Sequence, residues 1–223
     1  MQLSPEEKLK CSVPFVIEQN VDKAIECFTK AAELGDAVAK YWLGYSYMTG
    51  QHLDQNMEKG LELIKQSCEL KHPQALYFMY LLYHQGNEAV PANQKLAEQM
   101  FNAAIDAQSS DAFFDLADRF FHGTLGKQRD LKKAAYYYEQ AGRQGHGEAL
   151  FCLGSMHYNG LGVEKNLRTA YERYTQAVSS GTPEALVPLA RMTMKGEGTD
   201  ADKSKGEYLL NLARQQGVQY KEE

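Results

Sequence analysis

The sequence predicts an all-α protein, a right-handed α-solenoid built from antiparallel helix pairs. The first observation is a column of Asn or Asp residues spaced by 36 or 37 positions, at Asn20, Asn56, Asn93, Asp130, Asn166 and Asp202. Two further columns keep the same spacing: one of glycine, and one in which small residues alternate with large apolar residues. A single helix pair cannot bury both of its faces, so such repeats form a core only by stacking on their neighbours.

The Asn and Asp column marks the start of one helix in each repeat, which we term helix B. Side-chain oxygens of these residues accept hydrogen bonds from the free N–H groups at a helix start, so the column predicts N-caps. A small residue follows four positions later, then a large apolar residue, then another small one, as at Ala134, Tyr138 and Ala141. These three positions lie on one face of a helix, which predicts close packing against a neighbour.

A second helix, helix A, alternates with the first. Its face carries an alanine and, four residues later, a large apolar residue, as at Ala149 and Leu153. Eleven residues after each such alanine stands a glycine, which predicts the left-handed turn that ends the helix, at Gly50, Gly86, Gly123, Gly160 and Gly196. Helix B is expected to end the same way at Gly35, Gly145, Gly181 and Gly217. Lys71 and Gln108 replace glycine there, so these two turns are expected to be built differently or to carry strain.

The columns divide the chain into a cap segment, a repeat array and a tail. Residues 1–19 fit neither helix and are expected to form an N-terminal cap, with a short helix after Pro5 and a turn at Pro14. Residues 20–217 form the array: a lone helix B at 20–35, then repeats at about 36–72, 73–109, 110–146, 147–182 and 183–217. Residues 218–223 form a polar tail. The last helix, 203–216, is expected to be partly uncovered, with self-association through this end and fraying as the two alternatives.

These columns resemble the Sel1-like repeat family of the tetratricopeptide-like superfamily. The family pattern is roughly A-x-x-x-L-G-x-x-Y-x-x-G-x-G-V-x-x-D-x-x-K-A-x-x-W/Y-Y-x-x-A-A-x-x-G, and the fourth copy matches it at Ala149, Leu153-Gly154, Gly160-Leu161-Gly162-Val163, Asn166, Ala170, Tyr174, Ala177 and Gly181. A tetratricopeptide repeat itself has a period of about 34 residues. In this chain the period is longer, and Trp42 directly precedes Leu43-Gly44. The resemblance implies a helical repeat fold and no particular activity.

Composition excludes several classes of function. The 24 basic and 29 acidic residues give a net charge of −5, which argues against a nucleic-acid partner. Four cysteines at irregular spacing predict buried free thiols in a reducing compartment. The first seven residues carry two acids, Glu6 and Glu7, where a secretory signal would carry Lys or Arg, and no uncharged stretch is long enough to span a membrane. We therefore expect a cytoplasmic protein.

Catalytic and metal-binding patterns are scarce, so we expect no catalytic residue, no metal and no cofactor. His84, His122 and His157 fall near the same point of successive repeats, but no carboxylates stand in register with them. Asp115 and Asp118 lie one helical turn apart, and a solvated acidic patch explains them more simply than a general acid–base pair.

The outward surface of the A helices is the expected binding site. In a right-handed stack of helix pairs these helices line the concave side, and this groove is rich in aromatic residues, which carry much of the energy of protein recognition. The expected groove residues are Tyr41, Trp42, Tyr45, Tyr77, Phe78, Phe114, Asp115, Asp118, Phe121, Tyr158 and Arg191. The alternative is that the aromatic column packs between repeats.

The sequence therefore predicts a non-enzymatic adaptor or scaffold that binds a protein or peptide partner along this groove. A second hypothesis is an immunity protein or inhibitor that occludes a toxin or an enzyme, because an acidic groove suits a basic target. A hydrolase is a third hypothesis, and it would need a site that the sequence does not display.

Overall fold

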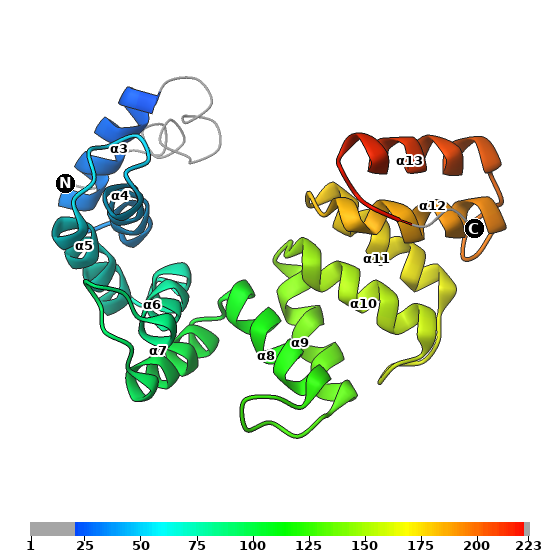
Figure 1. Cartoon of the computed structure of the whole chain (residues 1–223), viewed down its shortest axis with the longest axis horizontal. Helices are drawn as coiled ribbons and strands as arrows, with labels where there is room; N and C mark the ends of the chain where they lie inside the picture. Colours follow the sequence, from blue (N-terminus) through cyan, green and yellow to red (C-terminus); the bar gives the residue numbers. More distant parts are fainter. Residues whose placement is uncertain (1–20, 221–223) are drawn as a thin grey trace. The chain divides into compact units, whose positions relative to one another are not determined.

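The computed structural model of the protein describes residues 21–220, shown in Figure 1. Within this range the regular structure consists of eleven α-helices and one short 3₁₀ helix. The helices form two compact units, which divide between Ser109 and Ser110. The prediction of an all-helical solenoid is confirmed. The expected cap segment 1–19, the N-cap Asn20 and the end of the tail lie outside the described residues.

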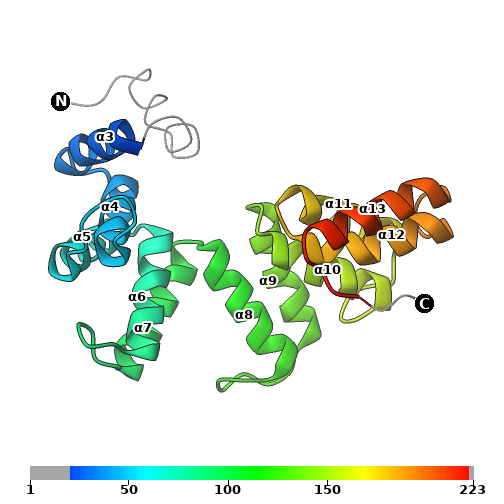
Figure 2. The same ribbon diagram turned by 45° about the horizontal axis from the view of Figure 1, so that its top comes forward.

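The first unit contains two helix pairs and one preceding B helix. The pairs lie side by side in Figures 1 and 2, with α4 beside α5 and α6 beside α7, while α3 packs on α4 and α5 packs on α6. The helix bounds are α3 (Val21–Glu33), α4 (Ala37–Thr49), α5 (Met57–Glu69), α6 (Pro73–Gln85) and α7 (Gln94–Asp106).

The second unit contains three helix pairs. Their bounds are α8 (Ser110–His122), α9 (Leu131–Arg143), α10 (Gly147–Asn159), α11 (Leu167–Ser179), α12 (Leu186–Lys195) and α13 (Lys203–Gln215). In this unit α12 is the shortest α-helix, with 10 residues where the others have 13. Its first turn is instead the 3₁₀ helix Pro183–Ala185, and Pro188 brings no N–H to the next turn.

The predicted helix starts are confirmed for every B helix whose cap is described. Asn56, Asn93, Asp130, Asn166 and Asp202 each accept a hydrogen bond from the backbone N–H three residues later, at 2.9–3.1 Å. Three A helices, α4, α6 and α10, also have side-chain N-caps, which the sequence columns did not reveal. Asp36, His72 and His146 each accept from the N–H of the following alanine three residues on.

The helix ends resolve the question posed by Lys71 and Gln108. Both residues adopt the left-handed conformation, with φ of 58° and 60°, as does Gly145 at the equivalent turn with φ of 83°. These two turns are therefore not built differently from the glycine turns. They keep the same left-handed φ with a side chain in place, which is a strained conformation. A side chain in this conformation costs roughly 1–2 kcal/mol.

The buried cores are shared between successive helix pairs. One cluster joins Ala117 of α8 and Tyr138 of α9 to Leu153 of α10, which belongs to the next pair. The following cluster joins Tyr174 of α11 to Met192 of α12 in the same way. In the first unit, a cluster made by Met48, Ile64 and Met79 spans α4, α5 and α6. Each helix pair thus completes its core with side chains from the pair beside it.

The loop glycines provide a second link between pairs. Gly162 has φ of +70°, and a Cβ placed on it would overlap the carbonyl group of Leu131, at the start of α9. Gly198 stands in the same relation to Leu167, at the start of α11. The second glycine of each G-x-G loop therefore allows the loop to lie directly on the B helix of the preceding pair.

The C-terminal residues pack back on the last helix pair. Val218 and Tyr220 contact the buried cluster of Leu186, Val187 and Ala213. Tyr208 on the outer face of α13 remains 65% exposed. The last helix is thus partly uncovered, as expected, and self-association through it stays a prediction.

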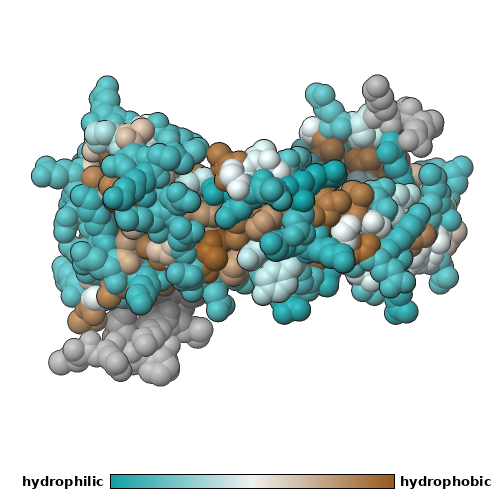
Figure 3. Space-filling model, turned by 90° about the horizontal axis from the view of Figure 1, so that it is seen from below, coloured by the Kyte–Doolittle hydropathy of each residue, from teal (hydrophilic) through white to brown (hydrophobic). Residues whose placement is uncertain are grey.

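No helix within residues 21–220 combines the length and the apolar character needed to cross a bilayer. On the face drawn in Figure 3, hydrophilic residues cover most of the surface, and hydrophobic residues appear among them as separate patches.

Candidate functional site

The first unit brings four of the expected groove residues into one group, which we call the first aromatic cluster: Tyr41, Trp42 and Tyr45 of α4 and Phe78 of α6. The ring centroids are 5.3 Å apart for Tyr41 and Trp42, 5.7 Å for Tyr45 and Phe78, and 6.4 Å for Tyr41 and Phe78. Most of these rings meet edge to face, which is a favourable geometry for aromatic pairs. The cluster therefore has a defined shape before any partner arrives.

The first aromatic cluster is half-buried. Trp42 packs partly against the core of α3 and α4, and Tyr41 and Phe78 pack partly against the core formed by α4, α5 and α6. Tyr45 packs on Trp42 and Phe78, and all four rings remain partly exposed. Tyr77 is a fifth expected residue, and its ring centroid lies 5.4 Å from that of Tyr80 on the same helix.

His72 borders this cluster and caps α6. Its Nδ1 accepts from the N–H of Ala75 at 3.4 Å, and its ring lies 5.3 Å from that of Tyr41. Burial lowers the pKa of His72 below its usual value, and the nearby charge of Asp36 opposes this in part. An unprotonated Nδ1 is what the cap requires, so burial and capping favour the same neutral form.

The second unit places three expected residues around Tyr138, which is 1% exposed. Phe114 and Phe121 of α8 lie with their rings 5.8 Å and 6.4 Å from that of Tyr138. Asp118, between them on α8, accepts a hydrogen bond from the Tyr138 hydroxyl. Burial, together with this bond to Asp118, raises the pKa of Tyr138 far above its usual value, so the hydroxyl stays protonated and donates.

The remaining expected residues of the second unit are Asp115, Tyr158 and Arg191. Asp115 binds Arg119 on the same helix, with an Oδ1 to Nε distance of 2.7 Å. Tyr158 of α10 donates to Glu197, which follows α12, at 3.0 Å. Arg191 is half-buried in α12. Asp115 and Asp118 thus engage separate partners, which is an arrangement suited to holding the surface in shape.

A family model matches most of this sequence. The Sel1 repeat model matches residues 15–36, 37–72, 73–109, 110–146, 147–181 and 183–218. The chain belongs to the Sel1 repeat family. No curated protein matches the sequence.

Solved Sel1 repeat structures share this fold. A Sel1 repeat protein from Oxalobacter formigenes is 23% identical, with a TM-score of 0.71 over 89% of this chain and 80% of its own. An immunity protein from Pseudomonas aeruginosa is 21% identical, with a TM-score of 0.64 over 96% of this chain and 83% of its own. A protective antigen of uropathogenic Escherichia coli, described as displaying an SLR fold, is 27% identical, with a TM-score of 0.66 over 95% of this chain; the chain spans 46% of its length.

Two thiols of this Sel1 repeat protein, those of Cys68 and Cys152, are held in their neutral form. Burial raises the pKa of Cys68 to about 12, and the charge of Glu69 adds to the shift. Burial raises the pKa of Cys152 to about 11, again with a smaller contribution from a carboxylate, Asp118. A nucleophilic cysteine requires the thiolate, so neither residue is poised for covalent chemistry. Within the part of the chain that the structure describes, no group of three His, Cys, Asp or Glu side chains is arranged to hold a metal.

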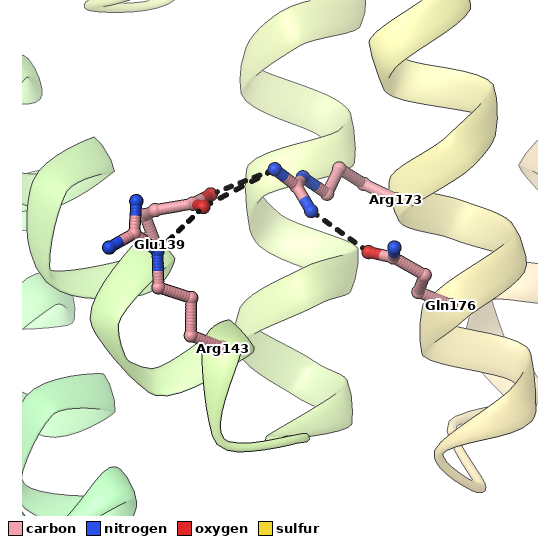
Figure 4. A network of polar contacts seen from close by, with 4 residues as sticks. All are labelled: Glu139, Arg143, Arg173 and Gln176. Carbon is pink, nitrogen blue, oxygen red and sulfur yellow. Dashed lines mark hydrogen bonds and ion pairs between the residues drawn. The ribbon is translucent and has the colours of Figure 1, made fainter.

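A polar network lies on the B helices, and none of its residues is among those that the sequence predicts for the groove of this Sel1 repeat protein. Glu139 of α9 binds Arg143 of the same helix and Arg173 of α11, with nitrogen–oxygen distances of 3.2 Å each, as Figure 4 shows. Arg173 also donates to Gln176 at 2.9 Å. The outward A-helix positions that predict the groove do not include these B-helix residues. Comparing charges position by position along the B helices would have singled out Arg143 and Arg173, although not their contacts with Glu139.

Proposed function

We propose that this Sel1 repeat protein is a non-enzymatic scaffold that binds a partner protein or an extended peptide along the outward surface of its A helices. Sel1 repeats are typical of protein–protein interaction scaffolds. The observation that carries the proposal is the first aromatic cluster, in which core contacts hold Trp42 and Phe78, Tyr45 packs edge to face on both, and all three rings are half-buried. Preorganised aromatic side chains bind at a low cost in conformational entropy.

The surface chemistry supports binding over hydrolysis. Asp115 is neutralised by Arg119, and Asp118 accepts from the buried Tyr138 hydroxyl. A general acid–base pair needs one carboxyl group held neutral and one charged at the same substrate, and the separate partners of these two residues favour a structural role for both.

The test compares partner capture by the wild-type protein and by groove variants. The double variant Trp42→Ala with Tyr45→Ala removes two rings, and Tyr45→Ala alone spares the core contact of Trp42. Tyr136→Ala is the matched control, because Tyr136 lies on helix B and is 59% exposed. In affinity capture from the native source, we expect the groove variants to lose a specific partner that wild type and the control retain. Unchanged capture by a double variant with intact helicity would rule out the groove.

An immunity protein or inhibitor is the second candidate. Residues 21–109, which include the first aromatic cluster, contain 11 acidic and 7 basic residues, a balance that suits a basic target. The fold is shared with an immunity protein from Pseudomonas aeruginosa. Co-purification with the product of a neighbouring gene, and an association rate that falls steeply with salt, would favour this candidate over a general adaptor. An association rate insensitive to salt would count against it.

A further inference from the structure

A hollow on the B-helix side of the second unit has an unusual chemistry. It has a volume of about 390 Å³ and lies over Leu150, between the C-terminal halves of α9 and α11. Two arginines line it, Arg143 and Arg173, together with the hydroxyl-bearing residues Thr175 and Ser179. All of these residues lie within the second unit, and none belongs to the A-helix groove described above.

The hollow coincides with three departures from the repeat pattern. Seven residues after the helix B N-cap, the other repeats carry Cys27, Leu63, Met100, Tyr137 and Leu209, whereas this repeat carries Arg173. Thirteen residues after the cap, the first three B helices carry Glu33, Glu69 and Asp106, whereas α9 carries Arg143. Repeat packing does not require the half-buried cation Arg173 or the reversed charge at Arg143, which makes both arginines candidates for a further role.

The third departure, Gly142, also lines the hollow. The equivalent position of the other B helices carries Ala32, Cys68, Ile105, Val178 or Arg214. A Cβ on Gly142 would lie 2.9 Å from Cδ2 of Leu150, at the floor of the hollow. The glycine therefore allows Leu150 to pack directly against α9, and a side chain here would displace the floor of the hollow.

The two arginines keep unused hydrogen-bonding capacity. Glu139 is the one carboxylate that pairs with them among the described residues, so the network carries one net positive charge. The buried Nε of Arg173 donates to no acceptor within residues 21–220. Arg143 is 68% exposed at its side chain, and only its Nε is bonded in the described part of the chain. Arginine N–H groups left in this state favour a carboxylate or phosphate oxygen.

The hydroxyl groups of Thr175 and Ser179, which line the hollow, favour a peptide ligand over a simple anion. Thr175 Oγ1 already donates to the carbonyl of Tyr171 at 2.8 Å, and Ser179 Oγ donates to that of Thr175 at 3.1 Å. Each oxygen therefore offers lone pairs, which accept from an N–H group. The carbonyl ends of α9 and α11, which line the same hollow, also favour donors over anions. A ligand that presents a carboxylate together with N–H groups satisfies both features.

We propose that this hollow is a docking site for an acidic side chain of an extended peptide segment of a partner protein. The carboxylate binds the guanidinium groups of Arg143 and Arg173, and backbone N–H groups of the peptide donate to Thr175 and Ser179. The site is separate from the A-helix groove, so the two surfaces can be tested independently.

The experiment uses the full chain and a fluorescein-labelled hexapeptide of alternating Glu and Gly, followed by fluorescence anisotropy. Arg173→Leu restores the apolar residue found in other repeats and is expected to fold at least as stably as wild type. Gly142→Ala changes no charge, but its Cβ overlaps Leu150 and so reshapes the floor of the hollow. We expect each variant to weaken peptide binding about tenfold or more, since each removes a charged hydrogen-bonding partner or the space for one.

The controls separate this site from general electrostatics and from the groove. Arg168→Ala removes a charge from the same helix α11, at a side chain that is 83% exposed, and is expected to change binding by less than about twofold. The Trp42→Ala and Tyr45→Ala double variant is expected to bind the acidic peptide as wild type does. The proposal is overturned if wild type binds the Gln-for-Glu peptide equally well, if Arg168→Ala loses as much affinity as Arg173→Leu, or if equimolar inorganic phosphate displaces the peptide.

Discussion

Replacing Gly162 with alanine tests the link between neighbouring helix pairs. Two costs add at this position. A side chain at φ of +70° costs roughly 1–2 kcal/mol, and the overlap of its Cβ with the backbone of Leu131 adds roughly 1–3 kcal/mol. The free energy of unfolding should therefore fall by about 2–5 kcal/mol. Urea denaturation of the full chain, followed by far-UV circular dichroism, measures this loss.

Gly181→Ala is the matched control for the backbone term. Gly181 has φ of +84°, and nothing lies within 4 Å of a Cβ placed on it. Its replacement should cost only the conformational strain of roughly 1–2 kcal/mol, reduced by the lower entropy of the unfolded chain. Equal losses for the two variants would refute the reasoning, because the contact with Leu131 would then contribute nothing.

Three further predictions follow from individual residues. Lys71→Gly or Gln108→Gly should raise the free energy of unfolding by about 1 kcal/mol in urea denaturation, because each relieves a left-handed side chain; no change would show the turns to be unstrained. Since burial lowers the pKa of His72, the unfolded chain binds its proton first, so stability is full above about pH 6.5 and falls below it. His72→Asn keeps a cap acceptor and should make the measured fall shallower, whereas an unchanged slope would exclude His72 as its source. Tyr138→Phe should cost about 1–3 kcal/mol of unfolding free energy, because Asp118 loses its donor; a neutral result would mean that water replaces the hydroxyl.

The fold was predictable because its determinants are local and repeated. An Asn or Asp cap at Asn56 or Asp202, followed by small and large residues on one face, specifies a helix without reference to distant residues. Repetition then identifies these positions, since a pattern that recurs five or six times is visible in one sequence. The A-helix caps were missed because this column mixes Asp36 with His72 and His146, although each accepts the same hydrogen bond.

The candidate site was harder to predict, because side-chain partners depend on which helices come together. Helical spacing predicts the outward A-helix position of Asp118. It does not predict the hydrogen bond that Asp118 accepts from Tyr138 of α9. Likewise, the charge of Arg173 is plain in the sequence, whereas its contact with Glu139 spans 34 residues. Residues that break a repeat column, such as Gly142 and Arg173, are therefore the most informative places to look for function in this chain.

The most direct test of the account is whether a cavity in one helix pair weakens the next. Leu153 of α10 is buried in a cluster that includes Tyr138 of α9, so Leu153→Ala should cost about 2–5 kcal/mol. Native-state hydrogen exchange of the full chain then reports where the loss falls. A core shared between pairs predicts that amide protection drops in α9 and α11 as well as in α10. Loss of protection confined to α10 and its own partner α11, with α9 unchanged, would contradict it.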